Sequence, residues 1–248
     1  MADSCTSGRR TSAVVIDRQA ECWTFTLNRP EKRNALSSEL VEALIEGVEE
    51  AHALNVPLLV FRGEGKNLSA GFDFTGYEEQ SEGDLVLRMV RIETLLQIIA
   101  SSRSLTVGFA QGRNFGAGVD LFAACKLRYC SSDASFRMPG LKFGLLLGTR
   151  RFRNIVGVAN ALSVLGSART FEASEAVDMG FVTQLAPEDK WPARIADASA
   201  TAQALDASTR ASLYQAMDLN DAAMDMAELV RSASKPGFKA RIQKYLGG

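Results

Sequence analysis

The stretch SSELVEALIEGVEEAHALNVPLLVFRG, residues 37–63, combines the two periodicities that decide the fold class. Apolar residues recur at helical spacing in its first part: Leu40, Val41, Leu44, Ile45, Val48 and Ala51. Ser37 stands before them at a position suited to an N-cap. Residues 57–61 then form a short unbroken apolar run, which is typical of a strand buried on both faces of a parallel sheet. The stretch therefore predicts an amphipathic helix followed by a buried strand.

The same alternation continues on both sides of this stretch. Trp23, Phe25 and Leu27 alternate with threonines and predict a half-buried strand, paired in a hairpin with residues 13–17. Downstream, the pattern predicts a helix at about 85–101, a strand at 105–110, a short helix at 119–125 and a strand at 127–131. Strands that alternate with helices imply right-handed crossover connections and an α/β architecture.

The pattern changes after residue 136, where strands become rare. We expect helices at 150–156, 160–165, 174–179, 191–219, 222–232 and 237–246, and one strand at 181–185. We therefore divide the chain into a flexible N-terminal arm at 1–12, an α/β core at 13–190 and a helical region at 191–248.

Composition excludes several classes of protein. The 248 residues carry 28 Lys and Arg against 29 Asp and Glu, and this formal net charge of −1 gives no overall attraction to nucleic acid or an anionic membrane. No apolar run approaches the roughly 20 residues of a membrane span. Cys5, Cys22, Cys125 and Cys130 show no CxxC spacing, which favours reduced thiols, a cytoplasmic location and no metal site.

Common catalytic motifs are absent. The single histidine, His52, falls near the end of the helix predicted within residues 37–63, where a surface role is expected. Without a second histidine, Ser-His-Asp and Cys-His mechanisms lack their base. Residues 63–67, GEGKN, do not satisfy the phosphate-loop pattern, and no GxGxxG follows the first strands.

Two glycine-containing loops follow predicted buried strands and suggest a site. They are residues 67–74, NLSAGFDF, and residues 112–121, GRNFGAGVDL. Ligands of α/β sheets usually lie at the carboxyl ends of strands, where these loops begin. Small residues permit close backbone approach, and free N–H groups at a helix start stabilise a negative oxygen. Two such loops can form an oxyanion hole from main-chain donors.

The chain resembles the crotonase (enoyl-CoA hydratase/isomerase) family over roughly residues 13–185. Five segments occur in the family's order and spacing: 27–36 (LNRPEKRNAL), 69–73 (SAGFD), 116–121 (GAGVDL), 136–139 (FRMP) and 173–182 (ASEAVDMGFV). The resemblance implies a spiral of ββα units, followed by a helical C-terminal trimerisation region. It also implies a homotrimer or a dimer of trimers, and an acyl-CoA thioester as the substrate.

The resemblance also assigns roles to residues. The backbone N–H groups of Ala70 and Ala117 would hold the thioester oxygen. Substrate contacts are expected from Lys32, Arg33, Ala35, Ser69, Gly71, Asp73, Gly116 and Gly140. Lys239 or Lys244 of a neighbouring subunit would assist in binding coenzyme A, which is part of the substrate. No separate cofactor or metal is implied.

The acid/base positions depart from the hydratase pattern. Hydratases of the family use two glutamates, whereas here Asp120 occupies the first position and Gly140 the second. Asp120 is therefore the single candidate for proton transfer, and efficient hydration is in doubt. Asp73 is a further carboxylate, at a position that tends to serve loop structure in the family.

An unusual arginine cluster follows at Arg150, Arg151 and Arg153. Arg150 is a candidate to bind a carboxylated acyl group, although a basic helix face, at a subunit contact or in solvent, is the favoured interpretation. The leading hypothesis is an acyl-CoA enzyme of the enoyl-CoA hydratase/isomerase type. The alternatives are a thioester-binding protein without hydratase activity, and a decarboxylase or hydrolase of carboxylated acyl-CoA.

Overall fold

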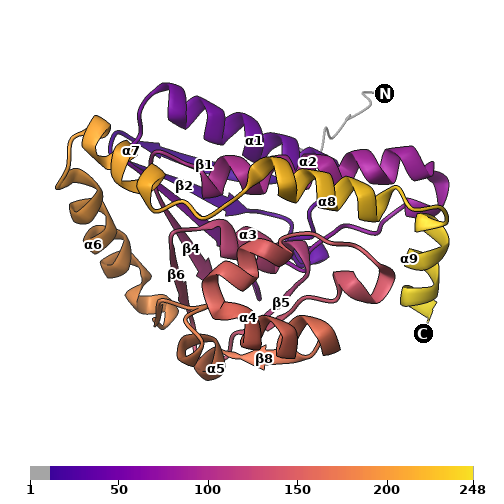
Figure 1. Ribbon diagram of the computed structural model, residues 1–248. Coiled ribbons are helices and arrows are strands. Elements are labelled where there is room, and N and C mark those ends of the chain that lie inside the picture. The colour runs from indigo at the N-terminus through magenta and orange to yellow at the C-terminus, as the bar shows by residue number, and fades with distance from the viewer. Residues whose placement is uncertain (1–11, 248) are drawn as a thin grey trace, which may run out of the picture.

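A six-stranded sheet forms the centre of the computed structural model, which describes residues 12–247 (Figure 1). Its strands lie in the order β1 (Val14–Gln19), β2 (Cys22–Leu27), β3 (Leu58–Gly63), β4 (Leu105–Ala110), β6 (Leu127–Cys130) and β9 (Gln184–Leu185). β1 and β2 form the predicted antiparallel hairpin, and each later pair is parallel. The predicted α/β class is confirmed, whereas the predicted flexible arm at 1–12 lies outside the described residues apart from Ser12.

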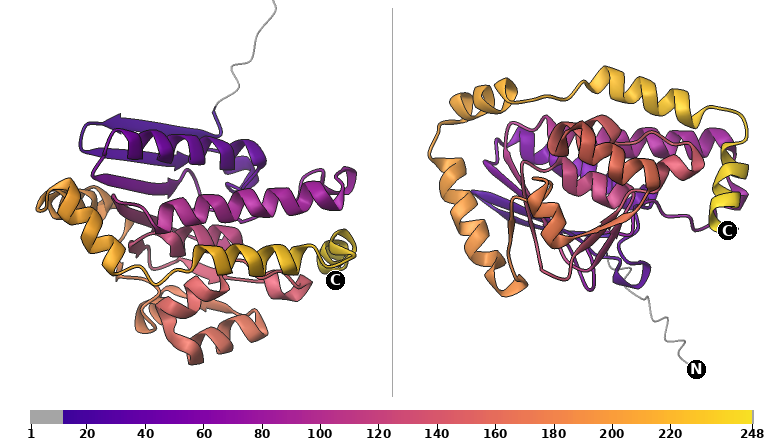
Figure 2. Two further views of the ribbon diagram at one scale, coloured as in Figure 1. Left: turned by 45° about the horizontal axis from the view of Figure 1, so that its top comes forward. Right: turned by 60° about the horizontal axis from the view of Figure 1, so that its bottom comes forward.

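Both faces of this sheet are covered, as β3 illustrates. Leu59 and Phe61 join the core beneath α1 (Ser38–Ala53) and α2 (Glu82–Ala100). Leu58 and Val60 point the other way, into a second cluster beneath α6 (Trp191–Gln203). Figure 2 shows α6 on the side of the sheet opposite α2. Burial on both faces is the physical reason for the unbroken apolar run at 57–61.

A second, three-stranded sheet was not predicted, and it positions two parts of the site. It contains β5 (Arg113–Phe115), β7 (Ser135–Arg137) and β8 (Thr170–Glu172). β5 leads directly into α3 (Ala117–Ala124), and β7 leads into the short 3₁₀ helix η3 (Gly140–Phe143). Strands of three residues are too short to show a period of two, so the sequence pattern gave no signal for them.

The helices of the second half differ in two ways from the predictions. The helices expected at 150–156 and 160–165 are two parts of α4 (Thr149–Ser167), which is kinked at Gly157. The single helix predicted at 191–219 is wrong, because the chain breaks before α7 (Ala207–Ala216). There the Asp206 carboxylate accepts hydrogen bonds from the N–H groups of Ser208 and Thr209 and starts a new helix.

The C-terminal helices wrap around the rest of the chain. After the small helix α5 (Ala173–Asp178) and α6, the helix α8 (Ala222–Ala233) runs along α2, and α9 (Phe238–Gly247) packs near η3 (Figure 1). The remaining 3₁₀ turns are η1 (Pro30–Lys32), η2 (Tyr77–Glu79) and η4 (Glu188–Lys190). The strand expected at 181–185 is limited to β9. None of the helices within residues 12–247 combines the length and the apolar character needed to cross a bilayer.

Candidate active site

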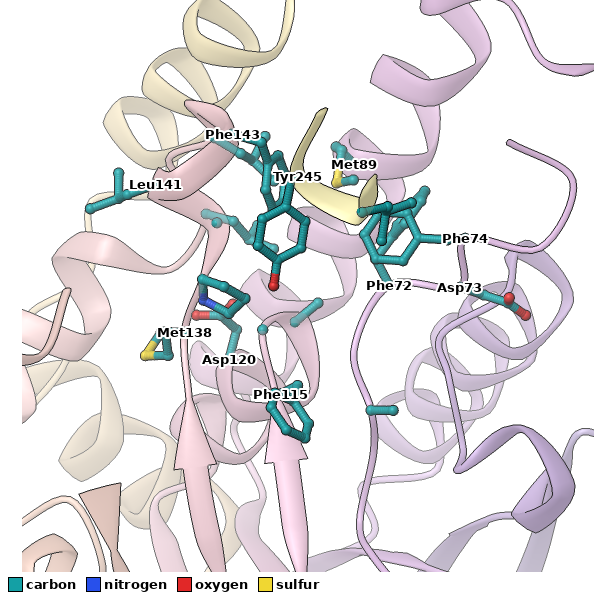
Figure 3. A pocket seen from close by; sticks show the side chains of 18 of the residues that line it. Phe72, Asp73, Phe74, Met89, Phe115, Asp120, Met138, Leu141, Phe143 and Tyr245 are labelled. Carbon is teal, nitrogen blue, oxygen red and sulfur yellow. The ribbon is translucent and has the colours of Figure 1, made fainter. Parts of the chain in front are cut away.

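A cavity of about 470 Å³ lies between the loop after β3, the start of α3, η3 and α9. Its walls are mainly aromatic and aliphatic, with Phe72, Phe74 and Met89 on one wall and Met138, Leu141 and Phe143 on the other (Figure 3). The predicted site residues that line the cavity are Lys32, Arg33, Ala70, Asp73, Gly116, Ala117, Asp120 and Gly140. Ala35, Ser69, Gly71 and Arg150 are not part of the lining.

Asp120 is the buried carboxylate of this cavity. It lies in the first turn of α3 and is only 3% exposed, and its Oδ1 has no hydrogen-bond partner among residues 12–247. Gly148, the N-cap of α4, lies against it, because a Cβ at Gly148 would stand 1.8 Å from Oδ1. Gly148 also has a φ of +62°. A side chain there would therefore be disfavoured both by the contact with Asp120 and by the backbone conformation. The carboxylate therefore sits beside the positive end of α4.

Two buried charges modify the ionisation of Asp120. Arg151 on α4 donates a hydrogen bond of 3.1 Å to Glu93 on α2, and both side chains are nearly inaccessible. Burial raises the pKa of Asp120 well above its ordinary value, the positive charge of Arg151 lowers it, and the negative charge of Glu93 raises it. Burial likewise raises the pKa of Glu93. The three groups thus influence one another electrostatically, although only Asp120 lines the cavity.

We expect opposite pH shifts when either member of this ion pair is neutralised. An Asp120 that accepts a proton acts as the carboxylate, so activity rises as the pH passes upward through its pKa. Arg151→Gln removes a charge that lowers this pKa, and the acid limb of kcat/KM moves to higher pH. Glu93→Gln removes a charge that raises it, and the limb moves to lower pH.

Both substitutions leave a buried charge unpaired and are expected to lower Tm. Stability loss alone would reduce activity without shifting the limb, so the two effects are separable in pH–rate profiles. Tyr245 also faces Asp120, from α9 (Figure 3). Both variants retain it, so it does not account for a difference between their pH–rate profiles. Shifts of the same sign would contradict the electrostatic interpretation.

The backbone donors of the predicted oxyanion hole need one correction. The Ala70 N–H donates to the Arg33 carbonyl at 2.8 Å, so it is not free to bind a ligand. Two residues later, the Phe72 N–H has no backbone acceptor within residues 12–247, and Phe72 lines the cavity. The same is true of Ala117, whose N–H is the first of α3 and has no partner in its own helix. The structure therefore offers Phe72 and Ala117, in place of Ala70 and Ala117.

Gly71 explains how these two loops come together. A Cβ at Gly71 would stand 2.4 Å from the Phe115 carbonyl oxygen and 3.2 Å from the Ala117 nitrogen, and its φ is +83°. Only glycine permits this approach. Ser69, which is fully buried, donates to the Asn34 carbonyl and accepts from the Gly71 N–H. Ser69 and Gly71 thus shape the loop rather than contact the cavity.

The cavity mouth carries the predicted cations Lys32 and Arg33, next to Glu31. The Ala35 N–H, in contrast, donates a hydrogen bond to the Lys32 carbonyl. Asp73 lines the cavity but accepts hydrogen bonds from Arg29 at 2.8 Å and from the Thr75 N–H at 3.0 Å. Burial raises the pKa of Asp73, but these hydrogen bonds outweigh it and leave the pKa lowered. In Figure 3 its carboxylate points away from Asp120. This orientation agrees with a role for Asp73 in the structure of the loop.

The arginine cluster is engaged elsewhere. Arg150 forms ion pairs with Asp225 at 2.8 Å and Glu228 at 2.9 Å on α8. Arg151 is buried against Glu93, and Arg153 donates to the neighbouring Asn154. The structure therefore does not bring Arg150 to the cavity, and its role is to join α4 to α8.

Three further predictions have clear outcomes. The Lys239 ammonium donates to the carbonyls of Glu78 and Gln80 in its own chain, so it is already occupied. His52 is half-buried instead of fully exposed, because its Nε2 lies 2.7 Å from the Ser102 hydroxyl. Burial lowers its pKa.

Cys22, Cys125 and Cys130 are free thiols, and Cys5 lies outside the described residues. Within residues 12–247 no group of three His, Cys, Asp or Glu side chains is placed to hold a metal.

Comparison with known proteins identifies the family. The family model described as enoyl-CoA hydratase/isomerase matches residues 17–243. The chain belongs to the enoyl-CoA hydratase/isomerase family. A Mycobacterium bovis relative named "Probable enoyl-CoA hydratase echA6" is 34% identical over 189 residues, which cover 74% of this chain and 76% of that protein. The peroxisomal Delta(3,5)-Delta(2,4)-dienoyl-CoA isomerase of Arabidopsis thaliana is 30% identical over 69% of this chain and 68% of its own length.

Solved structures confirm the crotonase-like fold. A crystal structure from Bordetella parapertussis, described as a "putative enoyl-CoA hydratase/isomerase", superposes with a TM-score of 0.95 at 63% identity and covers 96% of this chain and all of that one. The enoyl-CoA hydratase of Bacillus halodurans, at 20% identity, shares the fold with a TM-score of 0.81 over 94% of this chain and all of that one. The names of these relatives include both a hydratase and an isomerase. Family membership therefore leaves the choice of reaction to the chemistry of the cavity.

Proposed function

We propose that this member of the enoyl-CoA hydratase/isomerase family isomerises the double bond of an enoyl-CoA thioester. The single observation that carries the proposal is that Asp120 is buried in the cavity and has no ion-pair partner within residues 12–247, with Gly140 at the position of the second acid. Of the other carboxylates in the lining, Glu31 is exposed and Asp73 is paired with Arg29. One carboxylate suffices to take a proton from one carbon and return it to another.

The reaction follows from the positions of the groups. In a 3-enoyl thioester, the Asp120 carboxylate removes a proton from C2, and the electrons delocalise over C2 to C4 and the thioester oxygen. The N–H groups of Phe72 and Ala117 stabilise the resulting negative oxygen. Asp120 then returns the proton to C4, and the double bond lies between C2 and C3. We assign the phosphates of coenzyme A to Lys32 and Arg33, which line the cavity.

Two observations support isomerisation over the alternatives. The alternative of a carboxylated acyl substrate was motivated by Arg150, Arg151 and Arg153, and all three are engaged outside the cavity. Hydration requires a second proton-handling group, which Gly140 lacks. Since one such group is typically worth about 10²- to 10⁴-fold, we expect hydration of crotonyl-CoA to be at least about 100-fold slower than in a hydratase that has both acids.

The test is to incubate the protein with 3-enoyl-CoA thioesters of several chain lengths. The conjugated 2-enoyl product is followed by its ultraviolet absorbance, and deuterium uptake at C2 and C4 is followed in D₂O. The expected result is isomerisation with deuterium incorporation. Calorimetric binding of these thioesters without reaction or exchange at any chain length would instead indicate a thioester-binding protein.

The proposal includes assembly as a homotrimer or a dimer of trimers and a cytoplasmic location. Large apolar side chains are exposed around the connection between α7 and α8, where Met217 and Leu219 are 70% and 71% exposed. Faces of this kind are commonly covered by another subunit. Sedimentation equilibrium tests the assembly, and a monomer at micromolar concentration would contradict it.

A further inference from the structure

A second cavity, of about 340 Å³, lies between the end of α1, the loop that precedes β4, and α7. It shares no lining residue with the candidate active site. Among the described residues that line it, none is acidic. The side chains that give it its character are His52, Arg103, Ser208, Arg210, Ser212 and Gln215. The lining is therefore polar and carries an excess of positive charge.

Arg210 is the buried cation of this cavity. It lies on α7, is only 6% exposed, and donates through Nη1 to the carbonyls of Ala202 at 2.8 Å and Leu205 at 3.2 Å. These carbonyls belong to the end of α6, so the guanidinium is fixed in place. Its Nε has no hydrogen-bond partner within residues 12–247. Since buried polar groups are nearly always paired, the fold holds a charged donor here with part of its hydrogen-bonding capacity unused.

Arg103 and His52 add to the positive character. The Arg103 side chain is exposed and forms no hydrogen bond or ion pair in the part of the chain that the structure describes. The His52 Nε2 lies 2.7 Å from the Ser102 hydroxyl. Burial lowers the pKa of His52 most, and the positive charges of Arg103 and Lys126 lower it further. The imidazole thus reports a positive potential that no carboxylate of the lining offsets.

Polar side chains of α7 complete the lining. Ser208, Ser212 and Gln215 are exposed and recur at helical spacing, so they share one face of α7. The first N–H groups of this helix are not available, because the Asp206 carboxylate, which lies outside the lining, accepts the hydrogen bonds of Ser208 and Thr209. The available donors are therefore side chains, and they come from three separate elements.

This set of donors favours a phosphate group over other anions. Guanidinium groups bind both carboxylates and phosphates through paired N–H donors. A carboxylate has two oxygens in one plane, whereas a phosphate presents its oxygens in a tetrahedral arrangement. Donors that approach from α1, from the loop before β4 and from α7 are matched by the tetrahedral group. The neutral hydroxyl and amide groups of α7 supply further hydrogen bonds.

We propose that this cavity binds a phosphate group, held by Arg103 and Arg210, with His52 and the polar side chains of α7 as further ligands. The group is either free phosphate or the phosphate of a small monoester. The inference is independent of the proposed function, because it uses no residue of the active-site cavity. A phosphate bound here would join α7 to α1 and to the loop before β4, and would raise Tm by stabilising the folded state.

The experiment uses His52 as a probe, because it is the only histidine in the sequence. In a protein without a histidine tag, the imidazole NMR signals report on this cavity alone. Inorganic phosphate, adenosine 5′-monophosphate, adenosine and acetate are titrated separately at constant pH and ionic strength. We expect a saturable shift with phosphate, the monophosphate or both, at a Kd of about 1 mM or below. A response to the monophosphate alone would identify an ester as the ligand.

Arg103→Gln is the decisive variant, because this exposed side chain has no partner whose loss would unfold the protein. A hydrogen bond to a charged group corresponds to roughly 10- to 100-fold in affinity, so we expect the Kd to rise at least about tenfold with Tm unchanged in the absence of phosphate. Arg210→Gln should weaken binding similarly, and it should also lower Tm because it removes the contacts to the end of α6.

Arg33→Gln is the matched control, since it removes the same charge from the other cavity and should change the Kd by less than about twofold. The inference would be overturned if neither phosphate nor the monophosphate shifted the His52 signals at about 10 mM. Acetate that binds as tightly as phosphate would also overturn it, as would an Arg103→Gln protein with wild-type affinity.

Discussion

Asp120→Asn is expected to reduce the turnover of the best enoyl-CoA substrate by about 10³- to 10⁴-fold. The amide keeps the size and shape of the carboxylate but accepts no proton under assay conditions. The substrate still contacts Phe72, Ala117 and the cations at the mouth, so we expect the Kd for the thioester to change by less than about threefold. The measurement combines steady-state kinetics with calorimetric binding.

This substitution is also expected to preserve or raise stability. Asp120 is buried, and the ionised form of a buried carboxyl group is disfavoured, so the neutral amide removes that cost at neutral pH. A catalytic residue is often retained at the expense of stability. Asp178→Asn on the exposed end of α5 serves as the control and should leave both turnover and Tm unchanged. An Asp120→Asn protein with wild-type activity would disprove the role of Asp120.

The second large effect is expected from Ala117→Pro, which deletes one backbone donor of the proposed oxyanion hole. Ala117 is the first residue of α3, the position where proline is best tolerated because its missing N–H has no helical partner. Loss of one such donor typically reduces turnover by about 10²- to 10³-fold, and we expect a loss in kcat of this size. A smaller change in KM is expected, since the negative charge on the oxygen develops only during the reaction.

Ala117→Gly is the matched control, because it changes the side chain and keeps the N–H. Glycine in a first turn costs helix stability of up to about 1 kcal/mol but should retain turnover within about tenfold. Circular dichroism and Tm establish that both variants are folded. If Ala117→Pro is folded and as active as Ala117→Gly, the Ala117 N–H does not stabilise the reacting oxygen.

Local patterns in the sequence were sufficient for much of the fold and for the location of the site. The helix and strand of residues 37–63 follow from periodicity, because burial of one helix stripe and of both strand faces selects the residue types directly. Five segments taken as a set, including 69–73 and 116–121, identified the family, and the resemblance gave Asp120 and Ala117 as candidate site residues. Short-range patterns of this kind can be interpreted without knowing which segment packs against them.

Tertiary structure decided what depends on partners distant in the chain. The Ala70 N–H was predicted to be free, and only the fold shows that the Arg33 carbonyl accepts its hydrogen bond, which leaves Phe72 as the available donor. Arg150 was one candidate for a substrate ligand, and only the fold shows that it pairs with Asp225 on α8. Tyr245 lies 125 positions after Asp120 in the sequence. It faces the same cavity because α9 crosses the mouth of that cavity. A hydrogen bond, an ion pair or a cavity of this kind forms between two segments that are distant in the sequence. A local sequence pattern describes only one of these segments.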